Sequence, residues 1–428
     1  MGKKRSKPNG SGSKAQASKG GHGYYSADSQ DDEVETNCSE SDMQSVLSND
    51  EILGDPDQSS SSAVDALHEK FSDSINLLES RTASDREKSL NYICSILSSS
   101  FVPDLLENLS ETLCSAALKC LTKGKKTESK LASNLLLLLF VQLGADKMST
   151  HADEIRKGLL AASNNVNHSM ESRGRFFYIL SLCSFFSLDN EDDGNLLDSL
   201  ETVVCGTMKK EVVPLVAWAF ESWCVLAIQF RAERIVENSE KLLFRVLKIF
   251  EEFQDNKELR LGAGKMVALI YETFNNPEAQ VFRKFQKFED LYDLLEELSK
   301  KGSNVVSKRD KKAQKSSLRE AISYMDGESF KAEVVKFGKE TLVINSYSSY
   351  LLYEAFKEVL GTGVNKHLAV NPTVRTIFDL SEPGATGVSN LDRKTMKERM
   401  KGEFSENDKA RTLYLRKQRG KRTDHSYD

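Results

Sequence analysis

The sequence predicts a mostly α-helical protein: a HEAT- or armadillo-like α-solenoid, then a small α+β C-terminal module and a basic C-terminal helix, with a disordered N-terminal tail in front. Three observations predict this class. Apolar residues recur at helical spacing, the helical pattern repeats at a nearly constant interval, and the periodicity becomes that of strands near residue 330. The 428 residues allow two or three domains. The expected segments are a charged tail over 1–60, helical repeats over 61–300, a basic linker or helix over 301–325, the module over 326–390 and a basic helical arm over 391–428.

The N-terminal tail is rich in Ser, Gly, Asp and Lys and contains almost no apolar residues. Too little area can be buried there to offset the entropy cost of ordering, so we expect disorder. Lys3, Lys4, Arg5 and Lys7 have the density of a nuclear localisation signal, with a solubilising basic tail as the alternative. Gly2 with Ser6 also fits the short pattern for N-terminal myristoylation.

The helical repeats are expected to begin at Ser61. Apolar positions in two stripes are separated by the same steps of three and four residues. The first stripe is Val64, Leu67, Phe71, Ile75 and Leu78, and the second is Leu106, Leu109, Leu113, Ala117 and Cys120. Helix pairs should begin near residues 61, 103, 149, 194 and 236. These intervals of 42 to 46 residues are typical of HEAT or armadillo repeats.

Capping and breaking residues agree with this division. Ser84 and Thr127 should cap the second and fourth helices, and Pro103 should begin the third. Gly124 and Gly144 follow the expected helix ends.

Two segments, 176–188 and 212–228, are apolar almost all round. In a solenoid such helices form the inner layer, and amphipathic helices cover them. We therefore expect Trp218 and Trp223 in the core rather than on a contact surface. Further stripes, beginning with Leu243, Val246, Phe250 and Phe253, continue the repeats to residue 300.

A basic block follows the repeats, over residues 300–319. It contains Lys308, Arg309, Lys311 and Lys312, and Asp310 is the single opposing acid. Either it is a solvated linker that becomes a helix, or it contacts phosphates or forms part of a bipartite import signal.

The small module is predicted from a change of pattern. Residues 331–337 and 340–345 are rich in strand-forming residues, and Gly338 can supply the positive φ of a hairpin turn between them. A helix capped by Asn345 or Ser346 and ended by Gly361 should follow, with Leu352, Ala355, Phe356 and Val359 as its apolar stripe. Asn371-Pro372 should open a last short helix.

This module also resembles a known family. Four sequence motifs are similar to the C-terminal domain of the interferon-related developmental regulators. They are VKFG at 335–338, INS at 344–346, AFKEVLG at 355–361, and His367-Leu368 with Asn371. The resemblance extends more weakly from Ser61 to Arg422. One departure is Tyr347, where the family pattern leads us to expect a tryptophan.

The last segment, 391–422, carries twelve basic residues against five acidic ones. Glu406 and Asp408 follow Ser405, which can cap a helix, and seven of the bases cluster between there and residue 422, an order that suits the dipole of a helix starting at Ser405. Its few scattered apolar residues cannot form an ordinary core face, so a bound partner would have to be polyanionic. The residues expected to contact RNA or DNA here are Lys409, Arg411, Arg416, Lys417, Arg419, Lys421 and Arg422, in addition to the four of the basic block.

Catalysis, cofactors and membrane insertion are not expected. The six histidines show no metal-ligand spacing, no phosphate-binding loop is present, and Gly361-Thr362-Gly363 follows a helix rather than a strand. His367 is expected to be structural. The seven cysteines contain no CxxC pair, so we expect free thiols in a reducing, intracellular compartment. The longest apolar run, 135–141, is far shorter than a membrane span, and no small-molecule substrate is indicated.

The resemblance implies two modes of action in gene regulation. One is a ribosome-bound translational silencing factor whose C-terminal helix occupies the mRNA path; the other is a nuclear transcriptional co-regulator that recruits deacetylase-containing complexes. The expected partner is the ribosome or RNA, and alternatively co-repressor proteins, in the cytoplasm, the nucleus or both. The module is expected to cap the open end of the solenoid and to fix the direction in which the basic arm leaves.

Overall fold

The computed structural model describes residues 60–275, apart from residues 107, 187–189 and 254–255, together with residue 322 and residues 332–382. The chain divides into two compact units, Met1–Ala63 and Val64–Asp428. Apart from the first residues of one helix, the described elements lie in the second unit.

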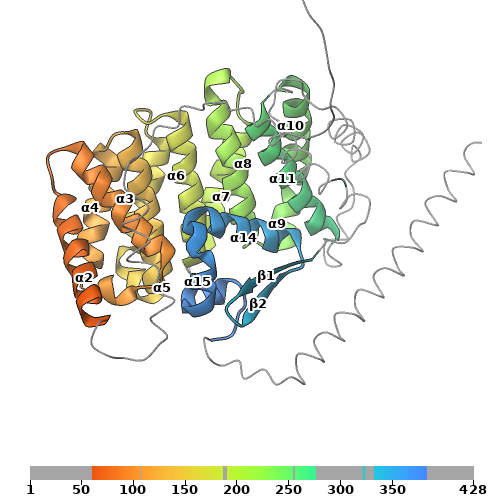
Figure 1. Ribbon diagram of the computed structural model, residues 1–428. Helices are drawn as coiled ribbons and strands as arrows, with labels where there is room; N and C mark the ends of the chain where they lie inside the picture. Colours follow the sequence, from red (N-terminus) through yellow and green to blue (C-terminus); the bar gives the residue numbers. More distant parts are fainter. Residues whose placement is uncertain are drawn as a thin grey trace, which may run out of the picture. The chain divides into compact units, whose positions relative to one another are not determined.

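Ten α-helices make up the repeat region in the described residues up to 275, and they confirm the solenoid (Figure 1). Helix α2 meets α3, where the hydroxyl of Ser89 donates to the carbonyl of Ser74. The other pairs are α4 with the first part of α5, the second part of α5 with α6, α7 with α8, and α9 and α10 with α11. Their bounds are α2 Ser60–Leu77, α3 Ala83–Ser99, α4 Ser110–Lys123, α5 Lys126–Asn164, α6 Met170–Cys183, α7 Asn190–Cys205, α8 Val213–Ala227, α9 Ala232–Glu237, α10 Ser239–Glu252 and α11 Lys257–Asn275.

Gly144 divides α5 into two helices. Its φ of +78° lies in the left-handed region, so the helical backbone is interrupted there. The label α5 covers the helical parts on both sides of this kink. The two parts belong to successive repeats, as the predicted helix end at Gly144 implies. By length and composition α5 is the one helix in the described residues that could cross a membrane, but most of it is buried against its neighbours, as expected of a core helix.

Helix starts differ from the prediction by small shifts at two places and by a larger one at a third. Helix α3 begins at Ala83 after Thr82, and α5 begins at Lys126, each one or two residues from the expected position. Pro103 begins a 3₁₀ turn, Pro103–Leu106, and α4 starts only at Ser110. Proline suits the first turn of either helix type, so the residue alone does not distinguish them.

The helices form two layers, as predicted. The second helices of the pairs, α3, α5, α6, α8 and α11, pack on one another in order, and α4, α7 and α10 cover them. In α6 every residue from Gly174 to Cys183 is buried. Trp223 lies fully in the core and donates its indole N–H to Glu201 at 3.2 Å. Trp218 is only partly buried, but it packs against the same core, with its ring 5.3 Å from that of Tyr178.

The C-terminal module has the predicted elements. Strands β1 Glu333–Phe337 and β2 Glu340–Ile344 pair antiparallel, with Phe337 opposite Glu340, and Gly338 supplies the turn at φ +54°. Helix α14, Tyr347–Leu360, is capped by Ser346 and ends at Gly361, where φ is +53°. A 3₁₀ turn, Gly361–Gly363, and the helix α15, Val364–Val370, were not predicted. Helix α16, Pro372–Ile377, is capped by Asn371 as expected.

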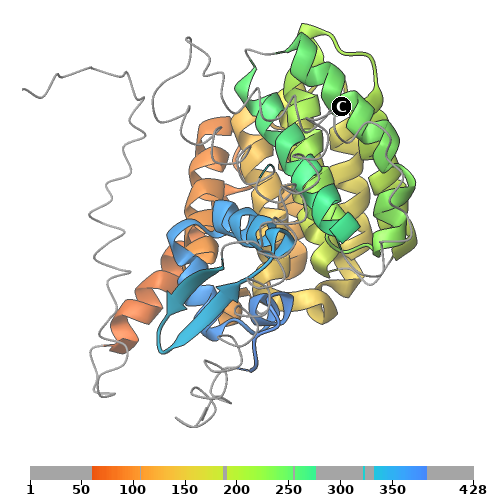
Figure 2. The same cartoon turned by 90° about the vertical axis from the view of Figure 1, so that its right-hand side faces the viewer.

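The position of the module corrects the prediction that it caps the open end of the solenoid. Helix α14 contacts α3, α8 and α11, α15 contacts α3, and α16 contacts α5. The module therefore lies across the inner-layer helices from the first repeat to the last described one, and Figure 2 shows it on one side of them. The module lies there because the inner-layer helices expose apolar side chains to it. The ring of Phe356, for example, packs against Phe185 and Phe186 in the middle of the solenoid.

Candidate nucleic-acid interface

The predicted contact residues lie outside the described residues. This holds for the arm residues Lys409, Arg411, Arg416, Lys417, Arg419, Lys421 and Arg422, for Lys308, Arg309, Lys311 and Lys312 of the linker, and for the proposed import signal Lys3, Lys4, Arg5 and Lys7. Their roles stay predictions. The described residues do show how the chain that leads into the arm is held.

Arg375 holds the end of the module. Its side chain is 1% exposed, and its Nε donates to the carbonyl of Ser381 at 2.6 Å. Its Nη1 donates to the carbonyl of Leu368 at 2.7 Å, and its Nη2 donates to the carboxylate of Glu340 at 2.8 Å. One guanidinium therefore joins α15, β2 and the segment just before the arm.

The backbone around Arg375 reinforces this anchor. Asp379 takes a left-handed conformation with φ +52°, and the N–H of Leu380 returns to the carbonyl of Arg375 at 2.8 Å. The last described residues, up to Glu382, thus leave the module in a fixed direction.

Asn371 ties the module to the solenoid. Its Oδ1 accepts from the N–H groups of Thr373 and Val374, and its Nδ2 donates to the carbonyl of Val141 in α5 at 2.9 Å. One side chain therefore caps α16 and crosses to the inner layer.

His367 is structural, as predicted. It is fully buried, its Nδ1 lies 3.0 Å from Nδ2 of Asn371, and its ring packs edge-on against Phe101. Burial lowers the pKa of His367 to about 4, which nearby backbone carbonyls of Leu97 and Ser98 oppose only partly. The ring is therefore neutral at physiological pH.

Arg175 connects α6 with α14. It forms an ion pair with Glu358 and also approaches Asn134 at 3.4 Å. Its guanidinium lies over two rings, 5.2 Å from the centroid of Tyr178 and 5.1 Å from that of Trp218. The partly exposed Trp218 thus supports an arginine that holds the module.

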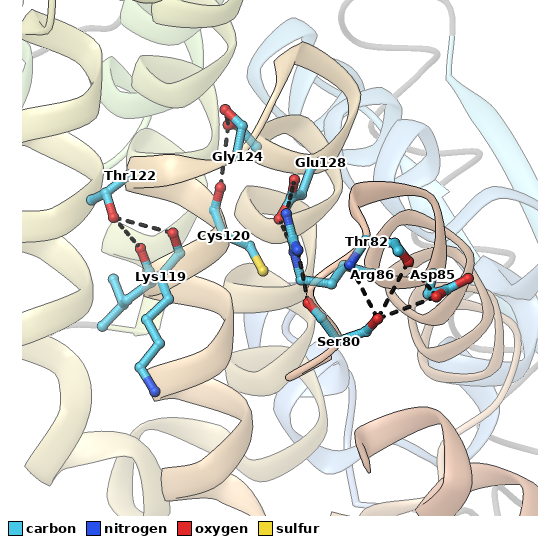
Figure 3. Close-up of polar contacts among 11 residues, drawn as sticks. Ser80, Thr82, Asp85, Arg86, Lys119, Cys120, Thr122, Gly124 and Glu128 are labelled. Atoms are coloured by element: carbon cyan, nitrogen blue, oxygen red, sulfur yellow. Dashed lines mark hydrogen bonds and ion pairs between the residues drawn. The ribbon is translucent and has the colours of Figure 1, made fainter. Parts of the chain in front are cut away.

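An open groove of about 720 Å³ lies between the α2–α3 turn and α4. On its floor Arg86 forms a bidentate pair with Glu128, at 2.6 and 3.0 Å, and donates to the carbonyl of Ser80 at 2.8 Å (Figure 3). Burial raises the pKa of Glu128, but the bonds from Arg86 and Cys120 outweigh this and hold that pKa below its usual value.

The groove does not suit thiol chemistry. Burial, helped by Glu128, raises the pKa of the Cys120 thiol to about 11, so it is not a ready nucleophile. The six cysteines of the described ranges are free thiols, as predicted, and all but Cys205 are buried. Within those ranges no three His, Cys, Asp or Glu side chains come together as a metal site.

Exposed lysines border the same groove, and sequence reasoning missed them. Lys119 and Lys123 line it, and Lys125, Lys126 and Lys130 follow through the turn into α5. The sequence does contain a signal for this basic patch, because five lysines fall within the twelve residues 119–130.

Comparison with known proteins covers most of the chain. The family model for interferon-related developmental regulators matches residues 35–326, which begins earlier than the expected residue 61, and the model for an interferon-related protein conserved region matches residues 371–423. Interferon-related developmental regulator 2 of Mus musculus is 30% identical over 354 residues, 79% of each chain. Interferon-related developmental regulator 1 of Homo sapiens is 28% identical over 352 residues, 77% of this chain and 75% of that one. A solved engineered protein matches 60% of this chain and 97% of its own at 15% identity, with a TM-score of 0.36, too low to inform on the fold.

Proposed function

Because the chain belongs to the interferon-related developmental regulator family, we propose that it is a non-enzymatic regulator of gene expression that binds ribosomes or RNA and silences translation through its basic C-terminal segment. The observation that carries the proposal is the anchor at Arg375. It fixes the chain at Ser381, shortly before a segment with twelve basic residues over 391–422.

The matched conserved region supports this coupling. It runs over residues 371–423 and so spans the helix cap at Asn371, the anchor Arg375 and the whole basic segment 391–422 as one block. A binding segment that leaves a rigid body in a fixed direction loses less conformational freedom on binding than a freely hinged one. The anchor would therefore favour a partner that offers phosphates at one defined place.

The binding physics is phosphate neutralisation. Lysine and arginine that pair with RNA phosphates release condensed counterions, so affinity falls steeply as salt rises. The location of the module also favours the C-terminal segment as the RNA contact. It covers the inner-layer helices, which in an open solenoid would offer an extended binding surface, so the charged segment is the better candidate for contact.

Sedimentation of cell lysate through a sucrose gradient tests the proposal. The full chain should accompany ribosomal fractions at low salt and leave them as salt rises. Replacing Arg416, Lys417, Arg419, Lys421 and Arg422 by Ala should reduce this association without lowering thermal stability. The matched control replaces five exposed lysines of the solenoid, Lys88, Lys209, Lys210, Lys241 and Lys248, and should leave the association unchanged. Absence of the full chain from every ribosomal fraction at low salt would refute the proposal.

A nuclear transcriptional co-regulator that recruits deacetylase-type complexes is the second candidate. The observation that favours it is the basic run Lys3, Lys4, Arg5 and Lys7, which would serve nuclear import. A fluorescently tagged chain separates the two functions. An exclusively nuclear signal would favour the scaffold, and a cytoplasmic signal that follows ribosomes would favour silencing.

A further inference from the structure

The turn between α4 and α5 is a concentrated positive surface, which we name the lysine turn. It comprises Lys119, Lys123, Lys125, Lys126 and Lys130, and all five side chains are exposed. The one acid in the same stretch, Glu128, is 1% exposed and paired with Arg86, so it does not offset the lysines at the surface.

Little of this charge is neutralised by neighbours. Lys126 pairs with Glu171 at 2.6 Å, but both side chains are more than half exposed, and such pairs exchange readily with other partners. Among the described residues, no carboxylate forms a salt bridge with the other four lysines. Glu79 and Glu111 also line the groove, but within the described ranges neither forms an ion pair with these lysines; Glu111 lies eight residues from Lys119 on α4, roughly 12 Å along the helix.

We propose that the lysine turn binds RNA phosphates and is a second RNA contact, separate from the C-terminal segment. The proposal rests on the proposed function for its biological setting, because an RNA-bound regulator gains affinity from two linked contacts in one chain. The turn also ends at the N terminus of α5, where the helix dipole has the same sign as the lysines.

The surroundings of the lysine turn favour RNA over a lipid surface. A peripheral membrane site needs an apolar or acylated anchor beside its basic charge. The large hydrophobic side chains that are exposed in the described ranges are Leu77, Leu160, Val166, Val334 and Val370, and none of them lies within residues 119–130. The exposed hydroxyl of Thr127 in the turn can donate a hydrogen bond to phosphate, whereas that of Thr122 donates to the carbonyl of Leu118 at 2.9 Å.

The test uses four full-length proteins: wild type, the turn variant K123A/K125A/K126A, the arm variant with the five C-terminal Ala substitutions, and a control, K209A/K241A/K248A, that removes equal charge from scattered exposed sites. Binding to a single-stranded RNA oligonucleotide is measured over a range of salt. Losing three phosphate contacts should reduce the slope of log affinity against log salt by about 2 in the turn variant. The control should retain the wild-type slope, and all four proteins should keep the same melting temperature.

Three results would overturn the proposal. The first is a turn variant with the wild-type affinity and slope. The second is a control that loses as much affinity as the turn variant, which would indicate an effect of net charge alone. In the third, phosphatidylserine vesicles would bind wild type and not the turn variant, while RNA binding stayed unchanged; the partner would then be lipid.

Sedimentation of the same proteins with purified ribosomes separates this inference from the proposed function. If the turn variant loses RNA binding while no protein sediments with ribosomes, the inference stands and the ribosome-bound silencing of the proposed function fails. If the arm variant leaves ribosomes while the turn variant binds RNA and ribosomes as wild type does, the proposed function stands and the inference fails.

Discussion

The carboxylate of Glu272 in α11 accepts the backbone N–H of Tyr347 at 2.6 Å, and its other oxygen accepts that of Ser348 at 2.9 Å. A side chain of the last described repeat thus caps the first turn of α14, which begins more than seventy residues later. The contact sets where α14 starts against the solenoid, and the ring of Tyr347 is buried beside it. The residue that departs from the family pattern therefore has a packing role.

Glu272→Ala should lower the free energy of unfolding by about 1–2 kcal/mol, because two N–H groups at a helix start lose a charged acceptor. Glu272→Gln should cost less, since the amide oxygen can still accept one bond. Urea denaturation followed by circular dichroism measures both. Equal stability of the Ala variant and wild type would show that water replaces the carboxylate without loss.

Phe356→Ala should cost about 3–5 kcal/mol. The ring is fully buried and meets Phe185 and Phe186 of the solenoid and Phe378 of the module. Val359→Ala on the same helix, at a half-buried position, is the matched control and should cost clearly less. Chemical denaturation should show one cooperative transition for both variants, because the two parts share this core; two separate transitions would contradict that.

His367 should make stability depend on pH. Its pKa of about 4 in the folded chain lies below the roughly 6.5 of an unfolded histidine, so below pH 6.5 the unfolded chain takes up the proton first. The stability present above pH 6.5 is lost as the pH falls toward 4, by about 3 kcal/mol in total. Urea midpoints between pH 7.5 and pH 4 measure this loss.

His367→Gln should flatten the stability profile between pH 6.5 and pH 4, at some cost in stability at neutral pH. The same substitution at His68, which is exposed on α2, is the control. A His367→Gln profile as steep as that of wild type would mean that other groups cause the dependence.

The helical repeats could be predicted because each repeat buries its own apolar stripe, and local spacing is visible in sequence. The hairpin, the cap at Ser346 and the stop at Gly361 were predictable for the same local reason. The module's place across the inner layer was not, because it depends on pairs such as Arg175 with Glu358, which are 183 residues apart. No local pattern encodes such a distance. Helix α15 could not be predicted because Gly361 is read as a helix end, whereas a 3₁₀ turn at Gly361–Gly363 connects α14 directly to α15.

In the candidate site, too, some features could be predicted from the sequence and others depend on the fold. Charge density indicated the C-terminal segment directly, whereas the anchor at Arg375 depends on Glu340 and Ser381 meeting one guanidinium in the folded module. The lysine turn falls between these cases. Its composition is visible in the sequence, but its exposure and the burial of Glu128 had to come from the structure.

A flexible insertion tests whether the anchor at Arg375 matters for binding. Several Gly and Ser residues placed after Glu382 should leave the melting temperature unchanged, because the last described contacts end at Ser381. Affinity for purified ribosomes should fall by about tenfold, because the arm of the insertion variant is freer before binding and so loses more conformational freedom on binding than the wild-type arm does. Affinity for a short RNA oligonucleotide should not change, which provides the control. Unaltered ribosome affinity would show that the exit direction is irrelevant.

Cosedimentation of purified ribosomes with the full chain and with a chain that lacks residues 391–428 measures whether the basic segment carries the binding. The full chain should sediment with ribosomes at low salt and dissociate steeply as salt rises, while the shortened chain should lose most of this binding at every salt concentration. Equal sedimentation of the two chains would contradict it.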